Sequence, residues 1–339
     1  MRTGRELILA TKAFAKEDRN KSWWLLLSTL FLLLGSLAAT FFIPYIWLKI
    51  PFSILSGLIM VRMFIIYHDF QHHAILHRSV LADVIMNIYG SYVMVPSSIW
   101  KRSHDYHHAH NSKLFSASIG SYPICTTGKY LSMTAGERRL YLFIRHPLTV
   151  LFGYFTMFMY GMCISSFMSA PRKHFDSLIA LAVHIGISVY VFITFGWDAW
   201  LFTVFLPVFI ACAMGAFHSL AQHNFPATSF TDKEDWKYEG AALESSSYMK
   251  MSPMMHWFLG NIGYHHIHHL NSRIPFYRLP ETMAAIPELQ AARTTSLHPK
   301  EIAACFRLKV WDPELKRMIG FRELKTYKTA KAQIVPNIS

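Results

Sequence analysis

Long hydrophobic stretches that could cross a membrane dominate this 339-residue chain. Residues 22–43 (SWWLLLSTLFLLLGSLAATFFI) carry no charged side chain, and residues 46–67 form a similar stretch directly after them. Residues 177–196 and 199–217 make a second close pair, separated by a short turn. Because about 20 apolar residues are enough for a helix to span a bilayer, the pattern predicts an all-α integral membrane protein with four transmembrane helices.

Polar residues are interleaved with these stretches, which argues against a separate soluble domain. We therefore divide the chain into a basic N-terminal segment (residues 1–21), a membrane domain (residues 22–290) and a basic C-terminal tail (residues 291–339). A polar head precedes the first apolar stretch and a second span follows it, so we do not expect a cleaved secretory signal.

Charge and cysteine content indicate on which side the polar segments lie. The chain has 33 Lys and Arg against 20 Asp and Glu, a net charge of +13 that is concentrated outside the spans. Such an excess marks the cytoplasmic side, so we expect both termini and the polar cap in the cytoplasm. The charge favours anionic lipid head groups or an acidic protein partner, and no nucleic-acid recognition motif accompanies it. The four cysteines form no CxxC pair, which fits a reducing compartment.

Three histidine clusters lie in polar segments beside the hydrophobic stretches. They begin at His68 (HDFQHH), His104 (HDYHH) and His265 (HHIHH). Spacings of three and four residues put side chains on one face of a helix, and imidazole is the commonest metal-binding side chain. Converging, these imidazoles would bind more than one ion. The candidate metal ligands are His68, His72, His73, His104, His107, His108, His265, His268 and His269.

Two carboxylates and one further histidine are candidates for supporting roles. Asp69 and Asp105 each follow a cluster histidine directly and could orient imidazole N–H groups from a second layer around the metal. The alternative for both is a solvated carboxylate. His184 lies inside the third predicted span, where an ionisable residue is either functional or a satisfied helix-packing histidine.

Parity of membrane crossings constrains two ambiguous stretches. For the three clusters to meet on one side, an even number of crossings must separate each from the next. Residues 80–100 contain Asp83 and Pro96 and resemble a helix lying in the membrane interface. Residues 148–168 carry no charged side chain, and hydropathy alone would let them span. Parity argues that residues 148–168 also lie in the interface, or dip into the membrane and return. We therefore predict four spans, interfacial helices and a cap carrying the histidines.

The ordered series HDFQHH, HDYHH and HHIHHL resembles the HxxxH, HxxHH and HxxHH boxes of the membrane fatty acid desaturase family. The run from Gly263 to Leu279 (GYHHIHHLNSRIPFYRL) is most similar to the acyl-lipid Δ12/ω-6 branch, and the similarity covers roughly residues 40–290. The resemblance implies an oxidoreductase that uses O2 to introduce a cis double bond into the acyl chain of a membrane lipid or an acyl-CoA.

The resemblance also implies two ferrous ions, held by the boxed histidines and by His223 after the fourth helix. The third box starts with His265 rather than the Gln of front-end desaturases. The sequence shows no fused cytochrome b5 module, so electrons are expected from a separate donor such as ferredoxin or cytochrome b5 with its reductase. The implied catalytic residues are His68, His72, His104, His107, His108, His265, His268 and His269.

Two other functions stay open at this point. A hydroxylase or ketolase acting on an alkane, sphingoid or carotenoid substrate would share the metal site but transfer oxygen to carbon. A metal transporter would place its ligands near the bilayer midplane, whereas these clusters lie beyond the predicted helix ends. For a desaturase the spans would enclose an acyl channel, with Gly35, Gly57 and Gly215 permitting close approach of helices.

Overall fold

Four long apolar helices form the core of the computed structural model, which describes residues 2–114, 122–231 and 235–324. They are α2 (Arg19–Phe42), α3 (Ile46–Gln71), α10 (Phe175–Phe195) and the continuous helix Trp197–Ala221. The last of these comprises α11 (Trp197–Trp200), a π-helical stretch (Leu201–Phe205) and α12 (Leu206–Ala221). The four predicted spans are therefore confirmed, each within a few residues of its expected bounds.

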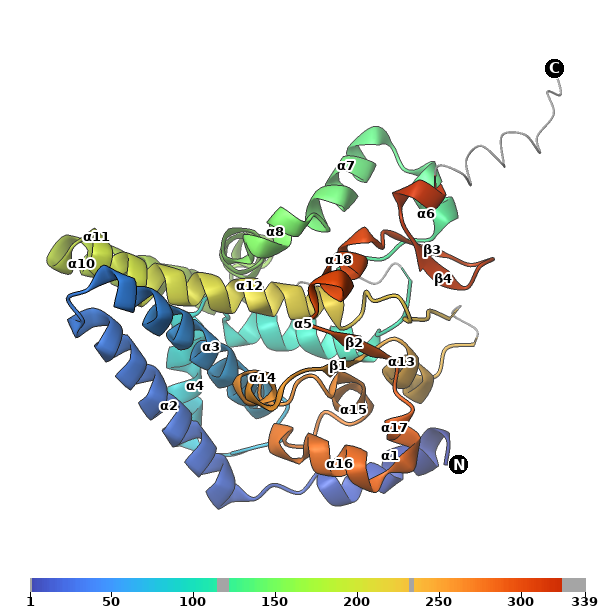
Figure 1. Ribbon diagram of the computed structural model, residues 1–339, viewed down its shortest axis with the longest axis horizontal. Coiled ribbons are helices and arrows are strands. Elements are labelled where there is room, and N and C mark those ends of the chain that lie inside the picture. Colours follow the sequence, from blue (N-terminus) through green and yellow to red (C-terminus); the bar gives the residue numbers. More distant parts are fainter. Residues whose placement is uncertain (1, 115–121, 232–234, 325–339) are drawn as a thin grey trace.

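Helix α3 is the central span. The most apolar stretch of α3 is 61% buried, against 11% for the corresponding stretch of α10, because α2 and α12 both pack on α3. The turns that join the helices of each pair lie together at the left of Figure 1. There the ring of Phe41 contacts that of Phe195, and Lys49 Nζ lies 2.7 Å from a carboxylate oxygen of Asp198. The opposite ends of the spans all point towards the cap.

The two ambiguous stretches are broken helices. The first forms α4 (Val80–Tyr92) and α5 (Ser97–Ala109), bent by 91°; only if this pair crossed as one unit would the described chain have a fifth span. The second forms α8 (Pro147–Leu151), a π-helical segment (Tyr154–Ser165) and α9 (Ser166–Ser169). This second stretch packs against α10 and α12.

His184 is a satisfied packing histidine. Its Nδ1 donates to the backbone oxygen of Tyr92 (2.8 Å), so its Nε2 accepts from the hydroxyl of Tyr154 (2.6 Å). These bonds tie α10 to α4 and to the π-helical segment. Because both ring nitrogens are paired, His184 can stay buried inside the bundle without a ligand.

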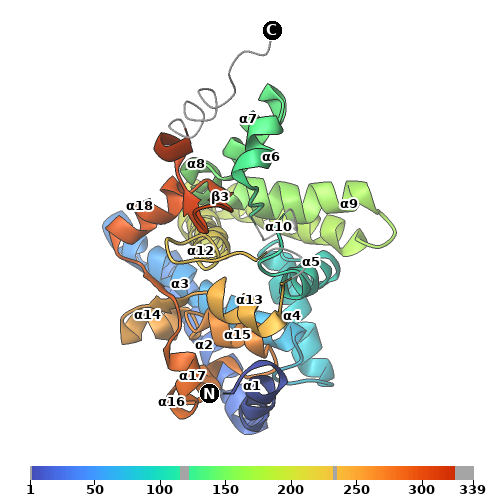
Figure 2. The same ribbon diagram turned by 90° about the vertical axis from the view of Figure 1, so that its right-hand side faces the viewer.

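The cap is built from short elements that come before, between and after the spans in the sequence. They are α1 (Gly4–Thr11), a 3-10 turn (Lys12–Phe14), α6 (Thr127–Ser132), α7 (Ala135–Ile144), α13 (Tyr238–Glu244), β1 (Tyr248–Lys250), α14 (Pro253–Phe258), α15 (His265–Leu270), a 3-10 turn (Phe276–Arg278), α16 (Leu279–Ala285), α17 (Pro287–Gln290), β2 (Thr294–Ser296), α18 (Pro299–Arg307), β3 (Val310–Asp312) and β4 (Arg317–Ile319). Figure 2 faces this side of the molecule, with α13 and α15 between α5 and α16.

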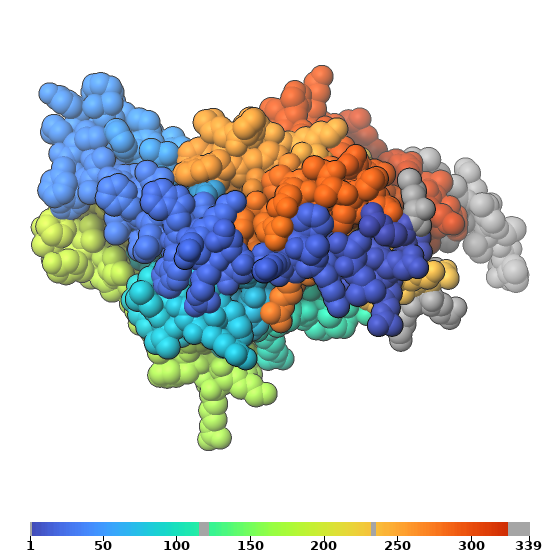
Figure 3. Space-filling model, turned by 90° about the horizontal axis from the view of Figure 1, so that it is seen from below, coloured from blue at the N-terminus to red at the C-terminus, as the bar shows by residue number. Residues whose placement is uncertain are grey.

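Both terminal segments are integrated into the cap as far as the structure describes them. Strand β2 pairs in parallel with β1, with Met249 opposite Thr295, and β3 and β4 form an antiparallel hairpin. Residues 291–324, expected to be a tail, therefore pack against the membrane domain. At the N-terminus, Arg2 pairs with Glu288 at 2.8 Å. Figure 3 shows the N-terminal segment in dark blue lying against the orange region of α16 and α17.

Candidate metal centre

Four separate elements bring histidines to one place at the cap end of the spans. Helix α3 continues beyond its apolar part and carries the first cluster in its last turn, and α5 carries the second. His223 follows α12, and the short helix α15 carries the third cluster. Spans thus position part of the site rigidly, while the cap helix α15 closes it from the other side.

The histidines fall into two groups. The first consists of His68, His72, His104, His108 and His268; the second consists of His107, His223, His265 and His269. Within each group the ligand atoms all lie within 4.8 Å of one another. The structure therefore brings together nine of the ten predicted ligands.

The Nε2 atoms converge in both groups. In the first group, those of His68 and His108 lie 3.0 and 3.1 Å from that of His104, and that of His268 lies 3.0 Å from His108. In the second group, the Nε2 atoms of His107 and His265 both lie 3.0 Å from that of His223. Ring nitrogens that converge in this way could share one ion per group.

The HxxHH clusters divide between the two groups in a reciprocal way. In α5, His104 and His108 join the first group while His107 joins the second. In α15 the division is the opposite: His265 and His269 join the second group, and His268 joins the first. The groups are therefore immediate neighbours: the rings of His108 and His269 stack with their centroids 4.3 Å apart.

Hydrogen bonds to the outer ring nitrogens fix two tautomers. His223 Nδ1 donates to the backbone oxygen of Ser245 (2.9 Å), because a carbonyl can only accept. His68 Nδ1 lies 3.1 Å from a carboxylate oxygen of Asp69, whose other oxygen accepts from the backbone N–H of Phe276 (2.6 Å). In both histidines the Nε2 lone pair consequently faces its group, as metal binding requires.

Burial keeps the imidazoles of His223, His265 and His269 neutral. It lowers the pKa of His223 to about 4, because the charged ring would lose its hydration. Burial also holds the pKa of His265 and His269 well below the ordinary value, and the neighbouring histidines add to the effect. Neutral rings with free lone pairs are the form of histidine that binds metal ions.

The donor set fits a pair of transition-metal ions. Each group offers at least four imidazoles, and imidazole suits iron, zinc and copper. His72 Nε2 is buried and has no hydrogen-bond partner among the described residues, and an ion in the first group would satisfy it. Two predicted site residues, His73 and Asp105, lie outside both groups, on the surface of the protein.

His73 is not brought to either group. Helix α3 ends at Gln71, and the turn that follows gives His73 a left-handed φ of 57°, which directs its exposed ring towards His77. The Nδ1 atoms of these two residues lie 3.1 Å apart. Asp105 also points outward, and its carboxylate, 52% exposed, pairs with Lys101 at 2.8 Å. The structure therefore brings neither side chain to the two histidine groups.

Sequence reasoning missed Trp100, which covers one side of the first group. Its ring stacks on that of His104, with centroids 4.5 Å apart and planes 21° apart. Trp100 lies four residues before His104 on α5, so its spacing in the sequence was an available signal. The tryptophan separates the group from the apolar packing around α3.

A mainly apolar cavity between the spans and the cap reaches both groups. His68 and His104 of the first group and His107, His223 and His265 of the second form part of its wall. The remaining wall is mainly apolar: Val61, Phe64, Met157, Phe158, Leu259 and Ile262. A second, smaller apolar cavity shares Phe158 and Gly215 with it and extends towards Tyr89.

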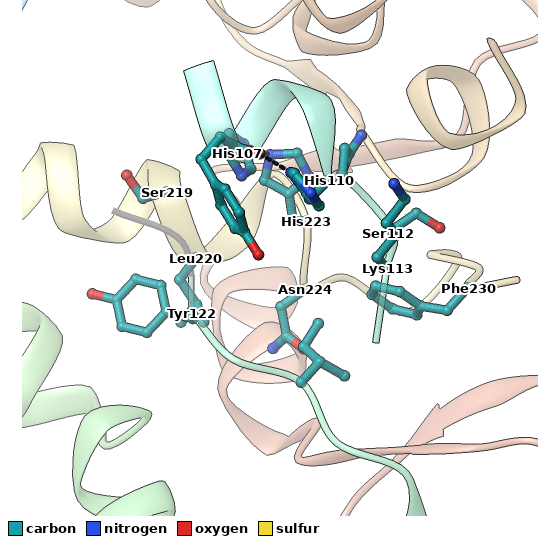
Figure 4. A pocket seen from close by; sticks show the side chains of 13 residues that line it. His107, His110, Ser112, Lys113, Tyr122, Ser219, Leu220, His223, Asn224 and Phe230 are labelled. Carbon is teal, nitrogen blue, oxygen red and sulfur yellow. Dashed lines mark hydrogen bonds between the residues drawn. The ribbon is translucent and has the colours of Figure 1, made fainter. Parts of the chain in front are cut away.

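A pocket whose wall is partly polar, the polar pocket, approaches the second group from the cap side; Ile124, Leu220 and Phe230 form apolar parts of its wall. Figure 4 shows His107 and His223 side by side at its inner end, with Ser219 of α12 next to them. Tyr106, His110, Asn111, Lys113 and Asn224 contribute to the rest of its wall. The second group thus lies between a polar and an apolar space.

Comparison with known proteins agrees with this geometry. The family model described as "Fatty acid desaturase" matches residues 44–300. A fatty acid desaturase of Bacillus subtilis is 26% identical over 329 residues, 95% of this chain and 92% of the relative. An sn-1 acyl-lipid omega-3 desaturase (ferredoxin) of Nostoc is 24% identical over 254 residues, 71% and 68% of the two chains. An sn-1 oleoyl-lipid 12-desaturase of Synechocystis is 22% identical over 273 residues, 80% and 77%.

A bundle of four apolar helices with two histidine groups at one end, together with the family match, identifies a membrane oxidoreductase of the histidine-box class. The family match covers more than half of the chain, and the chain belongs to the fatty acid desaturase family. It is accordingly an oxidoreductase that acts on fatty acyl chains.

Proposed function

We propose that this chain is a di-iron acyl-lipid desaturase that introduces a cis double bond at the Δ12 or ω-6 position. The observation that carries the proposal is the apolar cavity whose wall includes histidines of both groups. An acyl chain in this cavity would lie beside the ions. The names of the Synechocystis and Nostoc relatives support an acyl-lipid substrate.

We propose iron as the metal, with the two groups of histidines as its ligands. Bound there, a pair of ferrous ions would activate O2, the oxidant, so that hydrogen can be removed from an unactivated methylene while a donor supplies electrons. The family match supports this assignment, and the imidazole ligands are compatible with iron.

The residues of the chain would orient the metal ligands and place the acyl chain in an apolar environment. Asp69 and the backbone of Ser245 hold His68 and His223 in the orientation that faces the ions. Phe64, Phe158 and Leu259 form an apolar part of the cavity wall and would hold one methylene pair beside the ions. Selectivity for the position of the new bond would then follow from how the acyl chain lies between the two apolar cavities.

The electrons would come from a separate one-electron donor. We propose ferredoxin, or cytochrome b5 with its reductase, and the name of the Nostoc relative supports the first. We also propose that the cap, both termini and the metal centre lie in the cytoplasm, which the basic charge of the cap supports.

Fatty acid profiles of a host that makes this chain test the proposed reaction. We expect oleoyl lipids to become linoleoyl lipids, in a reaction that needs oxygen and a reductase system and that His104→Ala abolishes. A double bond at another position would overturn the proposed regiochemistry only. Products with a new hydroxyl or keto group and no diene would favour the oxygenase, and modified carotenoids with unchanged lipids would overturn the substrate class.

Labelling of single cysteines tests the proposed sidedness. We expect a cysteine at Ser272 and one at Glu314 to react only with reagent on the cytoplasmic side, and one at Tyr45 only from the opposite side. Tyr45 lies in the turn between α2 and α3, and its side chain is exposed. Labelling of Ser272→Cys and Tyr45→Cys from the same side would contradict the four-span topology.

A further inference from the structure

His218 in α12 has one nitrogen for which the described protein offers no partner. Its Nδ1 donates to the backbone oxygen of Met214 (2.7 Å), so the lone pair is on Nε2. The residue is only 6% exposed, and Nε2 is buried without a hydrogen-bond partner among residues 2–114, 122–231 and 235–324. A buried acceptor without a donor costs free energy, which points to a ligand that donates a hydrogen bond.

The place of His218 limits what this ligand can be. His218 belongs to the face of α12 that forms one wall of the larger cavity, together with Gly215, Ser219 and Gln222. The cavity is otherwise lined mainly by apolar side chains and by the histidines of the two groups. An acyl chain has no donor to offer to Nε2. A water molecule has two, and it is small enough to sit beside an acyl chain.

Ser219 provides a connection to the polar pocket on the cap side. Ser219, His107 and His223 line both the polar pocket and the apolar cavity, so these residues form the wall between them. Ser219 Oγ donates to the backbone oxygen of Gly215 (3.0 Å), which leaves its lone pairs available to a water molecule. His218 lies next to Ser219 on the inner side of this wall.

The proposed reaction needs such a connection. Each turnover converts one CH2–CH2 unit, O2, two electrons and two protons into one CH=CH unit and two molecules of water. The electrons come from the one-electron donor, whereas the protons must reach a centre that is buried under the cap. The two water molecules formed must also leave before the next acyl chain enters.

We propose, on the basis of the proposed function, that the polar pocket is the aqueous entrance to the second histidine group and that His218 holds its innermost water molecule. Ser219 passes hydrogen bonds from the pocket to this water, and Nε2 of His218 accepts one of its hydrogens. The water is thereby oriented towards the second group at the edge of the apolar cavity. His218 is a positioning residue, because it acts on the reaction through this water.

Thiol labelling of the purified metal-loaded protein tests the entrance without a measurement of activity. The four native cysteines are all buried, so a new cysteine can be read above a low background. We expect Ser219→Cys to react with a small polar methanethiosulfonate and Gly215→Cys, one turn deeper on the same face, to stay unreactive. An unreactive Ser219→Cys, or equal labelling of both variants, would overturn the entrance.

Two substitutions test the role of His218. We expect both His218→Phe and His218→Gln to keep the iron content of the parent. In His218→Phe, oxygen consumed per double bond should rise above the stoichiometric value of one, because O2 then takes two electrons and two protons to leave as hydrogen peroxide. His218→Gln, which keeps an acceptor, should stay closer to one. His77→Phe, an exposed histidine outside both groups, is the control.

The outcomes separate this inference from the proposed function. An unchanged ratio in His218→Phe would mean that His218 only packs, and a loss of iron would make it a metal ligand; either result overturns the proposal. If the parent chain forms no double bond in any lipid, the proposed function fails. The labelling of Ser219→Cys would still decide whether water reaches the second group.

Discussion

Asp69 joins the first histidine cluster to the C-terminal part of the cap. One carboxylate oxygen contacts His68 and the other accepts from the N–H of Phe276, which follows α15. The side chain is only 1% exposed, so its two hydrogen bonds replace the water that a carboxylate would otherwise bind. A single acidic group thus orients a ligand from α3 and holds the segment after α15.

Replacing this carboxylate should weaken metal binding. We expect Asp69→Asn to lower iron affinity about 10-fold to 100-fold, the usual cost of losing an outer hydrogen bond to a metal-bound histidine. Iron content after dialysis against graded chelator concentrations measures the effect. The matched control is Asp105→Asn, which removes a carboxylate that is paired with Lys101 on the surface. Equal losses in both variants would contradict the role of Asp69.

Because the clusters on α5 and α15 each supply ligands to both groups, the loss of one ligand should affect both metal ions. His107→Ala and His268→Ala each remove one ring from a different group. We expect both variants to lose both iron atoms, because α5 and α15 each carry ligands for the two groups and each ligand helps to position the neighbouring ion. Metal analysis of purified protein measures this. His73→Ala, outside both groups, should keep the iron content of the parent.

For individual residues, the sequence was a better guide to which histidines converge than to the direction in which each ring points. Helical spacing alone identified the two HxxHH clusters, because residues three and four apart share a face. It could not show that His107 joins a different group from His104 and His108, or that His268 joins a different group from His265 and His269. This division depends on how α5 and α15 approach one another. His73 lay beyond the end of α3, where helical spacing no longer applies.

At the scale of elements, the close packing of α3 against α12 depends on a glycine. A Cβ atom built on Gly57 would lie 2.9 Å from the Cβ of Ile210 and 3.0 Å from the backbone oxygen of Pro207. Gly35 on α2 has no atom within 4 Å of that position. The two glycines, alike in the sequence, therefore have different functions in the bundle.

Substitution of these glycines should separate the two cases. We expect Gly57→Ala to lower the free energy of unfolding by about 1–3 kcal/mol, because α3 and α12 must move apart. Gly35→Ala should leave stability unchanged or raise it slightly, since alanine favours the helix. Thermal unfolding in detergent measures both variants. A Gly57→Ala protein as stable as its Gly35→Ala counterpart would contradict the packing.

Hydropathy predicted the spans well and the cap poorly. Long uncharged stretches such as residues 22–43 leave few alternatives to a membrane helix. The cap consists of short helices and three-residue strands that neither length nor periodicity marks out. The pairing of β1 with β2 joins residues 46 positions apart in sequence, and only tertiary contacts determine it.

For the whole molecule, neutral buried histidines predict a loss of stability in acid. Burial lowers the pKa of His223 and of His266 to about 4 in the folded chain, whereas an unfolded histidine titrates near 6.5. The unfolded state therefore binds protons first as pH falls, which favours unfolding. The stabilising contribution is fully present above about pH 6.5 and is lost as pH falls towards and through 4.

The melting temperature between pH 8 and pH 4 should follow this dependence. We expect it to fall below about pH 6.5 in metal-free protein. In metal-loaded protein it should fall further over the same interval, because protons also compete with the ions for the ring nitrogens. A melting temperature that stays constant down to pH 4 in both forms would contradict the buried, neutral state of the histidines.

The position of α15 between β1 and β2 has a consequence for the order in which the protein is made. All four spans leave the ribosome before the third histidine cluster does, because α12 ends at Ala221 and α15 begins only at His265. Strand β1 precedes α15, and its partner β2 ends only at Ser296, so these two strands pair later still. The third cluster can therefore join the other two only after all four spans have been synthesised.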